Sequence, residues 1–226
     1  YSFGFAHKII RWFESYLSGR TQSVLVDNHL SDPSPICSGI PQGSSIGPIL
    51  FILFLNDIGT VIPDGVEYAI YADDLKIYGT VPDSAGLLQL ALDNIFQWSI
   101  SNNLGISETK TFVQHFGRTN PAFRYTINGQ FIQSTEQVKD LGLHISSDLS
   151  WSNHISKISL KAQSITNLMF RAFRSLSPEI YVKAYKTYIR PLLEFSTEVW
   201  NPTSVGLTNS IEAVQRAFTR RLFARC

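Results

Sequence analysis

The feature that most limits how this chain can fold is a pair of five-residue segments separated by only two residues. Residues 67–71 and 74–78 are rich in β-branched and aromatic side chains, and Ala72-Asp73 lies between them. Such segments favour strands, and two residues are enough to join antiparallel strands. The pattern therefore predicts a tight hairpin whose tip carries two adjacent aspartates, Asp73 and Asp74.

Adjacent aspartates at a hairpin tip are costly, because carboxylates repel each other and aspartate disfavours strands. A divalent cation offsets that cost, since Mg²⁺ prefers a few carboxylates together with phosphate oxygens of a substrate. In two-metal phosphoryl transfer, paired ions about 3.5–4 Å apart act on the attacking and the leaving oxygens. Taken alone, the tetrapeptide from Tyr71 to Asp74 fits a solvated turn equally well.

A loop rich in glycine and proline, residues 38–48, leads directly into an apolar segment. We expect a helix over residues 44–58, capped by Ser44 or Ser45, with Pro48 in its first turn. Its apolar character on all sides predicts deep burial. The glycines allow close approach of a ligand, and the helix N-terminus favours anions. A simple capped loop is the alternative interpretation.

Hydrophobic periodicity organises the rest of the chain. It predicts helices over residues 7–17 and 84–101, and a pair of strands over 21–26 and 33–38 around Asp27-Asn28. It also predicts strands over 111–116 and 138–145 and a hairpin around Asn128-Gly129. After residue 150 the pattern is helical only, with an apolar stripe from Trp151 to Ala172. The predicted fold class is α+β, with a boundary near residues 147–150.

Composition and charge exclude several classes of protein. At 226 residues with 44% hydrophobic and 16% charged residues, the chain is not disordered. Its two cysteines cannot form a disulfide framework, and it shows no signal peptide and no apolar run long enough for a membrane span. We therefore expect an intracellular protein of the cytoplasm or nucleus. Residues 1–150 hold 8 basic and 14 acidic residues, and residues 151–226 hold 11 and 4, so the basic tail could face phosphates.

The loop, the apolar helix and the acidic hairpin occur in the order found in a known family. The segments GIPQGSSIGPILFILFLNDI and YADD resemble the palm of a reverse transcriptase, in particular the polymerases of jockey-like non-LTR retrotransposons. Residues 7–24 resemble the segment between the first two palm motifs. Residues 189–202 (IRPLLEFSTEVWNP) and 211–222 (IEAVQRAFTRRL) resemble the tail that follows the palm, so the resemblance covers essentially the whole chain.

The resemblance implies a right-hand polymerase palm, an antiparallel sheet packed on helices, over residues 1–147. An α-helical thumb or connector region would follow over residues 148–226. The implied activity is RNA-directed DNA synthesis, in which deoxynucleoside triphosphates extend a DNA primer on an RNA template. The implied cofactor is a pair of Mg²⁺ ions, which Mn²⁺ could replace. No membrane and no particular protein partner is implied.

The resemblance also implies roles for single residues. Asp73 and Asp74 would be catalytic metal ligands, and Lys110 would act near the triphosphate and protonate the leaving pyrophosphate. In the motif before Lys110, Ser107 stands where the family usually has asparagine. Further residues would contact nucleotide, template or primer end, namely Tyr71, Ala72, Pro41, Gln42 and Gly43. Leu141 and Gly142 would belong to a primer grip, although Gly142 could equally mark an ordinary bulge.

One expectation concerns what the chain lacks. The family's first metal-binding aspartate lies on a strand upstream of residues 7–24, and no such strand precedes Tyr1. We therefore expect a fragment without the first palm motif and the fingers, inactive by itself. The alternative is a catalytically dead relic, or a domesticated fragment that binds nucleic acid or a partner. A polymerase of the intron-maturase or telomerase type is a third interpretation, against which the VWNP tail argues.

Overall fold

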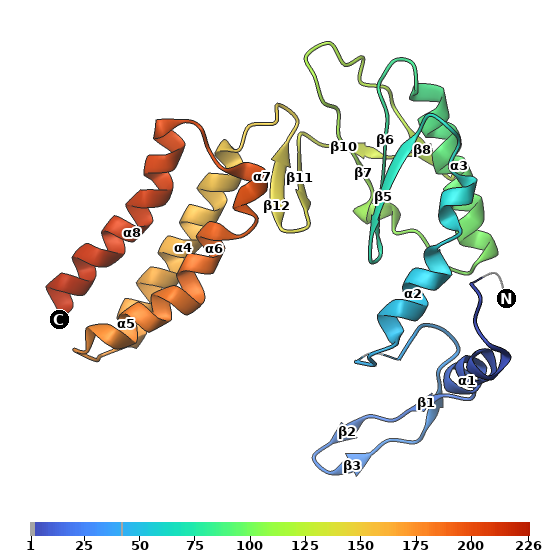
Figure 1. Cartoon of the computed structure of the whole chain (residues 1–226), viewed down its shortest axis with the longest axis horizontal. Coiled ribbons are helices and arrows are strands. Elements are labelled where there is room, and N and C mark those ends of the chain that lie inside the picture. The colour runs from blue at the N-terminus through green and yellow to red at the C-terminus, as the bar shows by residue number, and fades with distance from the viewer. Residues whose placement is uncertain (1–2, 42) are drawn as a thin grey trace. The chain divides into compact units, whose positions relative to one another are not determined.

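The structure is a computed structural model that describes residues 3–41 and 43–226 (Figure 1). The chain divides into two compact units. The first comprises residues 1–80 and 86–104, and the second comprises residues 81–85 and 105–226. Both contain helices and strands, in agreement with the predicted α+β class. Each described strand pairs with only one other strand, so no larger sheet is formed among them. The palm sheet, the thumb and the boundary at residue 147 therefore stay predictions.

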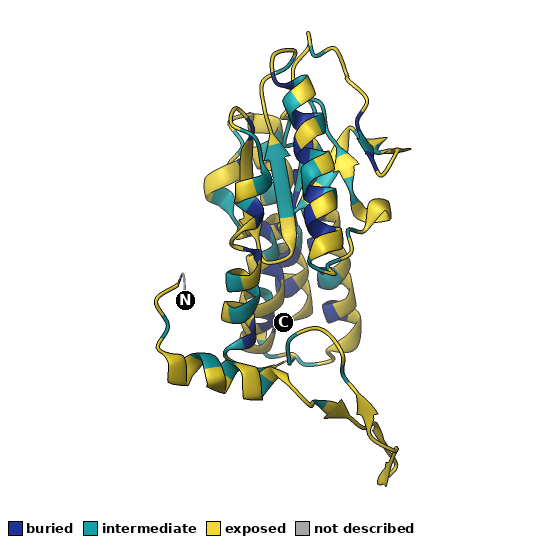
Figure 2. Ribbon diagram, turned by 90° about the vertical axis from the view of Figure 1, so that its right-hand side faces the viewer, coloured by how far each residue is buried: buried dark blue, intermediate teal, exposed yellow. Residues whose placement is uncertain are grey.

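The first unit begins with a helix and an extended ribbon. Helix α1 spans His7–Leu17, as its periodicity predicts. The ribbon that follows consists of four short strands, β1 (Thr21–Gln22), β2 (Leu25–Val26), β3 (His29–Leu30) and β4 (Ser34–Pro35). Strand β2 turns into β3 through Asp27 and Asn28, both with positive φ, so the chain reverses where predicted. The predicted strands are broken, because β2 pairs with residues 29–30 and β1 pairs with β4. All four strands are exposed and appear yellow in Figure 2.

Helix α2 (Gly47–Leu55) is shorter than expected and less buried. Pro48 does lie in its first turn, but the helix begins after both predicted capping serines. Only Gly47 and Leu55 are buried, whereas Ile52 is 61% exposed, so the prediction of deep burial is wrong. An all-apolar sequence does not indicate which side has a neighbour. In the C-terminal turn of α2, the Phe54 ring packs against the Trp98 ring, with 5.9 Å between the ring centroids.

The remainder of the first unit carries the predicted hairpin and its supporting helix. A short 3₁₀ turn, η1 (Ile58–Val61), precedes strands β5 (Glu67–Tyr71) and β6 (Asp74–Tyr78). Helix α3 (Ala85–Ser101) follows within one residue of its predicted start. Leu88 and Ile95 are buried on its predicted inner face. The hairpin and the amphipathic helix are thus confirmed.

The second unit begins with short strands. These elements are η2 (Glu108–Lys110), β7 (Phe112–Val113), β8 (Thr126–Ile127), β9 (Gln130–Phe131), β10 (Gln133–Ser134), β11 (Gln137–Asp140) and β12 (Leu143–Ser146). Strands β8 and β9 join through Asn128-Gly129, as predicted. The single strand expected over residues 138–145 is wrong. Leu141 and Gly142 both have positive φ and form a two-residue turn, so β11 and β12 are a hairpin.

The tail is helical, as its pattern predicts. Its elements are α4 (Ser152–Ala172), α5 (Pro178–Ala184), the π-helical turn η3 (Tyr185–Ile189), α6 (Arg190–Glu194), α7 (Thr197–Trp200) and α8 (Val205–Arg225). The apolar stripe of α4 is confirmed, because Ile155, Ala162 and Met169 are buried. These helices enclose a core that includes Tyr181 and Phe218. Among the described residues, no helix combines the length and apolarity that a membrane span requires.

A buried histidine connects the β11–β12 hairpin to α4. The His144 backbone N–H donates a hydrogen bond of 3.2 Å to Nδ1 of His154, which is only 2% exposed. An accepting Nδ1 places the proton of the neutral ring on Nε2, which has no partner among the described groups. Burial, and then the nearby His144, lower the pKa of His154 below its ordinary value of 6.5. The ring is therefore held neutral in the folded protein.

The free energy of unfolding of the second unit is expected to decrease as the pH falls below 6.5. The unfolded chain binds a proton at His154 in that range and the folded chain does not, so each pH unit costs up to about 1.4 kcal/mol. The pKa of His144 is lowered as well, by burial and then by Lys157 and Lys139, so it acts in the same direction. Urea unfolding at pH 7.5 and 5.5, followed by circular dichroism, measures the difference. His154→Phe should reduce it, whereas His29→Gln, on the exposed ribbon, should not.

Candidate active site

The predicted acidic hairpin is formed in the expected register. Tyr71 pairs with Asp74 at the tip, and Glu67 pairs with Tyr78 at the base, so two residues, Ala72 and Asp73, make the turn. Directly paired residues point to the same face of an antiparallel ladder. The register therefore places Tyr71 and Asp74 on one face of the hairpin, next to the turn that carries Asp73.

The turn is held in an uncommon backbone conformation. Ala72 has a φ of +53°, in the left-handed region, where a residue with a Cβ atom is destabilised by about 1 kcal/mol or more. Glycine and asparagine adopt this conformation more readily, and neither is present here. A local cost of this kind is frequent at functional sites.

The two carboxylates suit a divalent cation. Asp73 and Asp74 are exposed, and neither carboxylate has a hydrogen bond or ion pair with another described residue. Their oxygen atoms are the hard donors that Mg²⁺ and Mn²⁺ prefer. Among the described residues no group of three metal-binding side chains gathers, so the hairpin tip offers two neighbouring carboxylates without a third protein ligand. Mg²⁺ is commonly held by one or two carboxylates together with substrate phosphates.

The opposite face of the hairpin rests on the segment before it. Tyr68 and Ile70 lie on this face with their partners Ile77 and Leu75. The Tyr68 hydroxyl end lies so close to Gly59 that a Cβ atom there would be 2.2 Å from Oη. Sequence periodicity could not predict this contact, because here a strand residue packs against a turn residue that has no side chain.

Helix α3 anchors the same segment by two hydrogen bonds. The Trp98 indole Nε1 donates to the Asp57 carboxylate at 3.1 Å, and the Asn94 amide donates to the Val61 carbonyl at 2.8 Å. The Asp57 carboxylate thus has a structural role, because it links α3 to the residue that precedes η1. Its partner is a tryptophan far along the chain, which sequence reasoning did not find. These contacts fix η1, on which the hairpin rests.

Gly59→Ala is expected to destabilise the hairpin, because the new methyl group would displace the Tyr68 ring. Overpacking of this kind costs about 1–3 kcal/mol. Amide hydrogen exchange of β5 and β6 should become faster. The matched control is Gly86→Ala in α3, where a Cβ atom meets nothing within 4 Å, and where alanine should stabilise the helix by up to about 1 kcal/mol. Unchanged exchange in Gly59→Ala would show that Tyr68 does not support the hairpin.

The glycine-rich loop folds back on the start of α2. Gly39 and Gly43 have positive φ, and Gly47 is buried. A Cβ atom at Gly47 would lie 2.7 Å from Ser44 Oγ and 3.3 Å from the Pro41 carbonyl, so the loop itself makes the close approach that the glycines permit. Ser44 Oγ also accepts a hydrogen bond of 2.9 Å from Gly47 N–H.

The loop residues that were predicted to contact template or nucleotide differ in their exposure. Gly43 is exposed and Pro41 is half-buried in this loop, whereas Gln42 lies outside the described residues. The first unit therefore holds Pro41, Gly43 and the hairpin tip, and each of these roles stays a prediction.

The other predicted site residues belong to the second unit. Lys110 ends η2 and is exposed. Leu141 and Gly142 form the turn of the β11–β12 hairpin, and a Cβ atom at Gly142 would lie 3.0 Å from the Phe195 ring. The glycine signal in this segment therefore marks a hairpin turn rather than a bulge. The roles of these three residues also stay predictions.

Comparison with known proteins identifies the family. The description "Reverse transcriptase (RNA-dependent DNA polymerase)" belongs to the family model that matches residues 1–145. Because the match covers more than half of the sequence, the chain belongs to the reverse transcriptase family. Enzymes of this family generally use divalent metal ions.

The relatives place the chain among mobile elements. It is 29% identical to the RNA-directed DNA polymerase from mobile element jockey of Drosophila melanogaster, over 92% of this chain and 24% of the relative. The jockey polymerase of Drosophila funebris is also 29% identical, over 95% and 25%. A probable polymerase from the transposon X-element of D. melanogaster is 27% identical, over 92% and 24%. The resemblance to jockey-like non-LTR retrotransposons is thus confirmed, and the chain spans about a quarter of these relatives' length.

Proposed function

We propose that this chain supplies the metal-binding hairpin of an RNA-directed DNA polymerase, which extends a DNA primer on an RNA template by two-metal phosphoryl transfer. The observation that carries this proposal is the pair of free, exposed carboxylates at the tip of a strained hairpin. The family match and the jockey relatives support it. The palm and thumb arrangement around this hairpin is part of the proposal.

Each residue of the proposed site has a task that its chemistry allows. Asp73 and Asp74 hold divalent cations, preferably Mg²⁺, which when bound activate the primer 3′-hydroxyl and stabilise the leaving oxygens. Tyr71, on the same face as Asp74, orients the primer end. Exposed Lys110 offers a cation, and a proton, to the pyrophosphate. Pro41, Gln42 and Gly43 with Ala72 contact template and nucleotide, and the Leu141-Gly142 turn contacts the primer.

The experiment transfers the segment into a working enzyme. Residues 1–226 replace the matching quarter of the D. melanogaster jockey polymerase, and extension of a DNA primer on an RNA template is measured with Mg²⁺. Template-dependent synthesis by the chimera supports the proposal. A folded chimera that makes no DNA, while the parent enzyme does, contradicts it.

The 1–226 chain alone is proposed to be inactive in the same assay, because two carboxylates do not complete a two-metal site. Extension by the purified chain, lost in Asp73→Asn, would refute this part of the proposal. Binding of nucleic acid without synthesis is the second candidate function. Two observations favour nucleic-acid binding. The tail carries 11 basic and 4 acidic residues, and arginines on α8, including Arg220, are exposed. RNA binding by the chain that Asp73→Asn leaves unchanged, together with an inactive chimera, would favour this second function.

A further inference from the structure

The side chain of Arg20 joins two parts of the first unit that are distant in the sequence. Its Nε donates a hydrogen bond of 3.1 Å to the Leu17 carbonyl, in the last turn of α1. Its Nη2 donates to the Gly39 carbonyl, 19 residues ahead, in the segment between β4 and α2. A single guanidinium group thus ties the end of α1 to the glycine-rich loop of residues 38–48.

The end of α1 explains the first of these two bonds. Ser18 caps the helix, and Gly19 has a φ of +64°, so the chain leaves the helix at this point. The last carbonyls of a helix lack partners inside it and carry a partial negative charge, which favours a cation. Capping therefore accounts for the bond to Leu17. It does not account for the bond to Gly39.

The Arg20 backbone holds the chain just before the loop. Its carbonyl accepts a hydrogen bond of 2.9 Å from the Ile36 N–H, which extends the β1–β4 pairing by one position. The side chain then binds Gly39, three residues further on. Gly39 has a φ of +80°, so the chain turns where the guanidinium binds it. Arg20 thus fixes both the entry to the loop and its first turn.

The far end of the loop is held by its own residues. The Ser44 N–H donates to the Pro41 carbonyl at 3.4 Å, and Ser44 Oγ accepts a hydrogen bond from the first residue of α2. Pro41 and Gly43 lie between these two fixed ends. Among residues 3–41 and 43–226, no group other than Arg20 donates to the Gly39 carbonyl. Arg20 is therefore the restraint on the first half of the loop.

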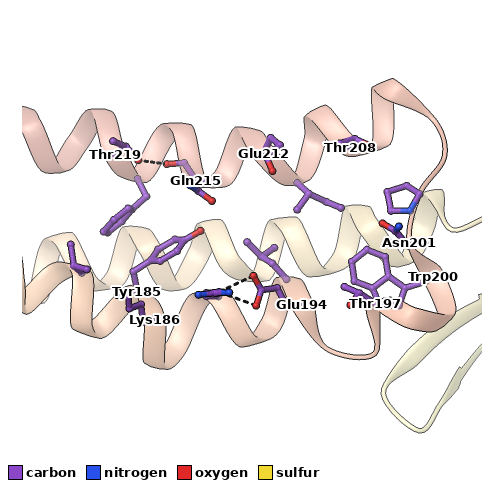
Figure 3. Close-up of a pocket in the computed structure, with 16 residues that line it drawn as sticks. Tyr185, Lys186, Glu194, Thr197, Trp200, Asn201, Thr208, Glu212, Gln215 and Thr219 are labelled. Carbon is purple, nitrogen blue, oxygen red and sulfur yellow. Dashed lines mark hydrogen bonds and ion pairs between the residues drawn. The ribbon is translucent and has the colours of Figure 1, made fainter.

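Neither side-chain bond of Arg20 completes a hydrophobic core. Every residue of α1 is described and none is buried, and Gly39 is exposed as well. Arg190 shows the more local use of an arginine, since it donates to both carboxylate oxygens of Glu194 one helical turn away. Figure 3 draws these two bonds as dashed lines to Glu194. Arg20 instead fixes the position of an exposed loop.

We propose that Arg20 is a positioning residue for DNA synthesis, which holds the glycine-rich loop where Pro41 and Gly43 meet the incoming deoxynucleotide. This inference rests on the proposed function and adds to it a residue that touches neither metal nor substrate. Arginine suits the task because its planar group presents the Nε and Nη donors in a fixed fork. Lysine has the same charge but a single donor nitrogen, so it cannot reproduce the fork.

The first test measures primer extension by the jockey chimera at increasing deoxynucleotide concentration. Arg20→Lys and Arg20→Gln should each raise KM about tenfold and change kcat less than about twofold, because a released loop weakens nucleotide binding and leaves the metal site intact. Arg11→Gln is the matched control. It removes the same charge from an exposed residue of α1 and should leave KM and kcat unchanged.

Two kinetic results would overturn the inference. Wild-type KM in Arg20→Lys, with a raised KM in Arg20→Gln, would mean that Arg20 acts as a charge near phosphate, since lysine also makes such a contact. A lower kcat at unchanged KM would mean fewer folded molecules, and hence a structural role only.

The second test needs no activity, so it separates this inference from the proposed function. Backbone ¹⁵N relaxation of the 1–226 chain should give order parameters of about 0.85 at Gly39 and Ile40, and Arg20→Gln should lower them below about 0.6. Arg11→Gln should leave them unchanged, and circular dichroism verifies that each variant folds. Unchanged order parameters in Arg20→Gln would overturn the inference. An inactive chimera contradicts the proposed function, whereas an active chimera with unchanged kinetics in both Arg20 variants contradicts this inference alone.

Discussion

Asp73→Asn in the jockey chimera is expected to lower the rate of primer extension by about 10³-fold. The substitution keeps the size of the side chain and removes the negative charge that holds a divalent cation. Metal stabilisation of the transition state contributes several kcal/mol, and each 1.4 kcal/mol corresponds to a tenfold change in rate. Asp74→Asn should have a comparable effect, since the ladder places it next to the same turn.

The control for these variants is Asp64→Asn, an exposed aspartate in the turn before β5. It removes the same charge nine residues before Asp73, and the variant should extend primers at the rate of the unaltered chimera. Manganese gives a second readout that does not need activity. Mn²⁺ added to the ¹⁵N-labelled 1–226 chain should broaden the amide signals around residues 71–75, and Asp73→Asn should abolish this. Equal activity of Asp73→Asn and Asp64→Asn would exclude Asp73 as a metal ligand.

Trp200→Ala is expected to cost about 3–5 kcal/mol of stability in the second unit, as buried tryptophans typically do. Trp200 is 1% exposed and packs in a core with Leu143 and Ile155. Its ring meets His154 at 5.0 Å, and its indole Nε1 donates a hydrogen bond of 2.7 Å to the Phe195 carbonyl. Trp200→Ala loses the buried volume of the indole ring and leaves the Phe195 carbonyl without its hydrogen-bond donor.

Urea unfolding followed by circular dichroism measures the effect, because the second unit contains the longest helices. Trp200→Phe keeps much of the ring and loses the indole donor, so it should cost less than Trp200→Ala. Val199→Ala is the matched control, because Val199 is next to Trp200 in the sequence and its own side chain is 59% exposed. A small loss in Trp200→Ala, similar to that of Val199→Ala, would mean that this core does not hold β12, α4 and α7 together.

Local sequence determined the helices and the tightest turns of this protein. Asn128-Gly129 and Asp27-Asn28 turn as predicted, since these residues adopt positive φ readily and the preference acts within two residues. The acidic hairpin and helices α1, α3, α4 and α8 follow from periodicity in the same way. The order of loop, apolar helix and YADD was also sufficient to recognise the family, which the comparisons confirm.

Tertiary structure decided what periodicity cannot encode. Leu141 is not a typical turn residue, yet Leu141-Gly142 closes a hairpin in which Leu143 of β12 packs with Ile155 of α4. The exposure of α2 depends on which neighbours it has, and its uniform apolarity does not specify them. The hydrogen bond from Trp98 to Asp57 and the packing of the buried His154 ring on Trp200 both join residues distant in the chain. Such contacts depend on how whole elements pack, whereas propensity acts only over a few neighbouring residues.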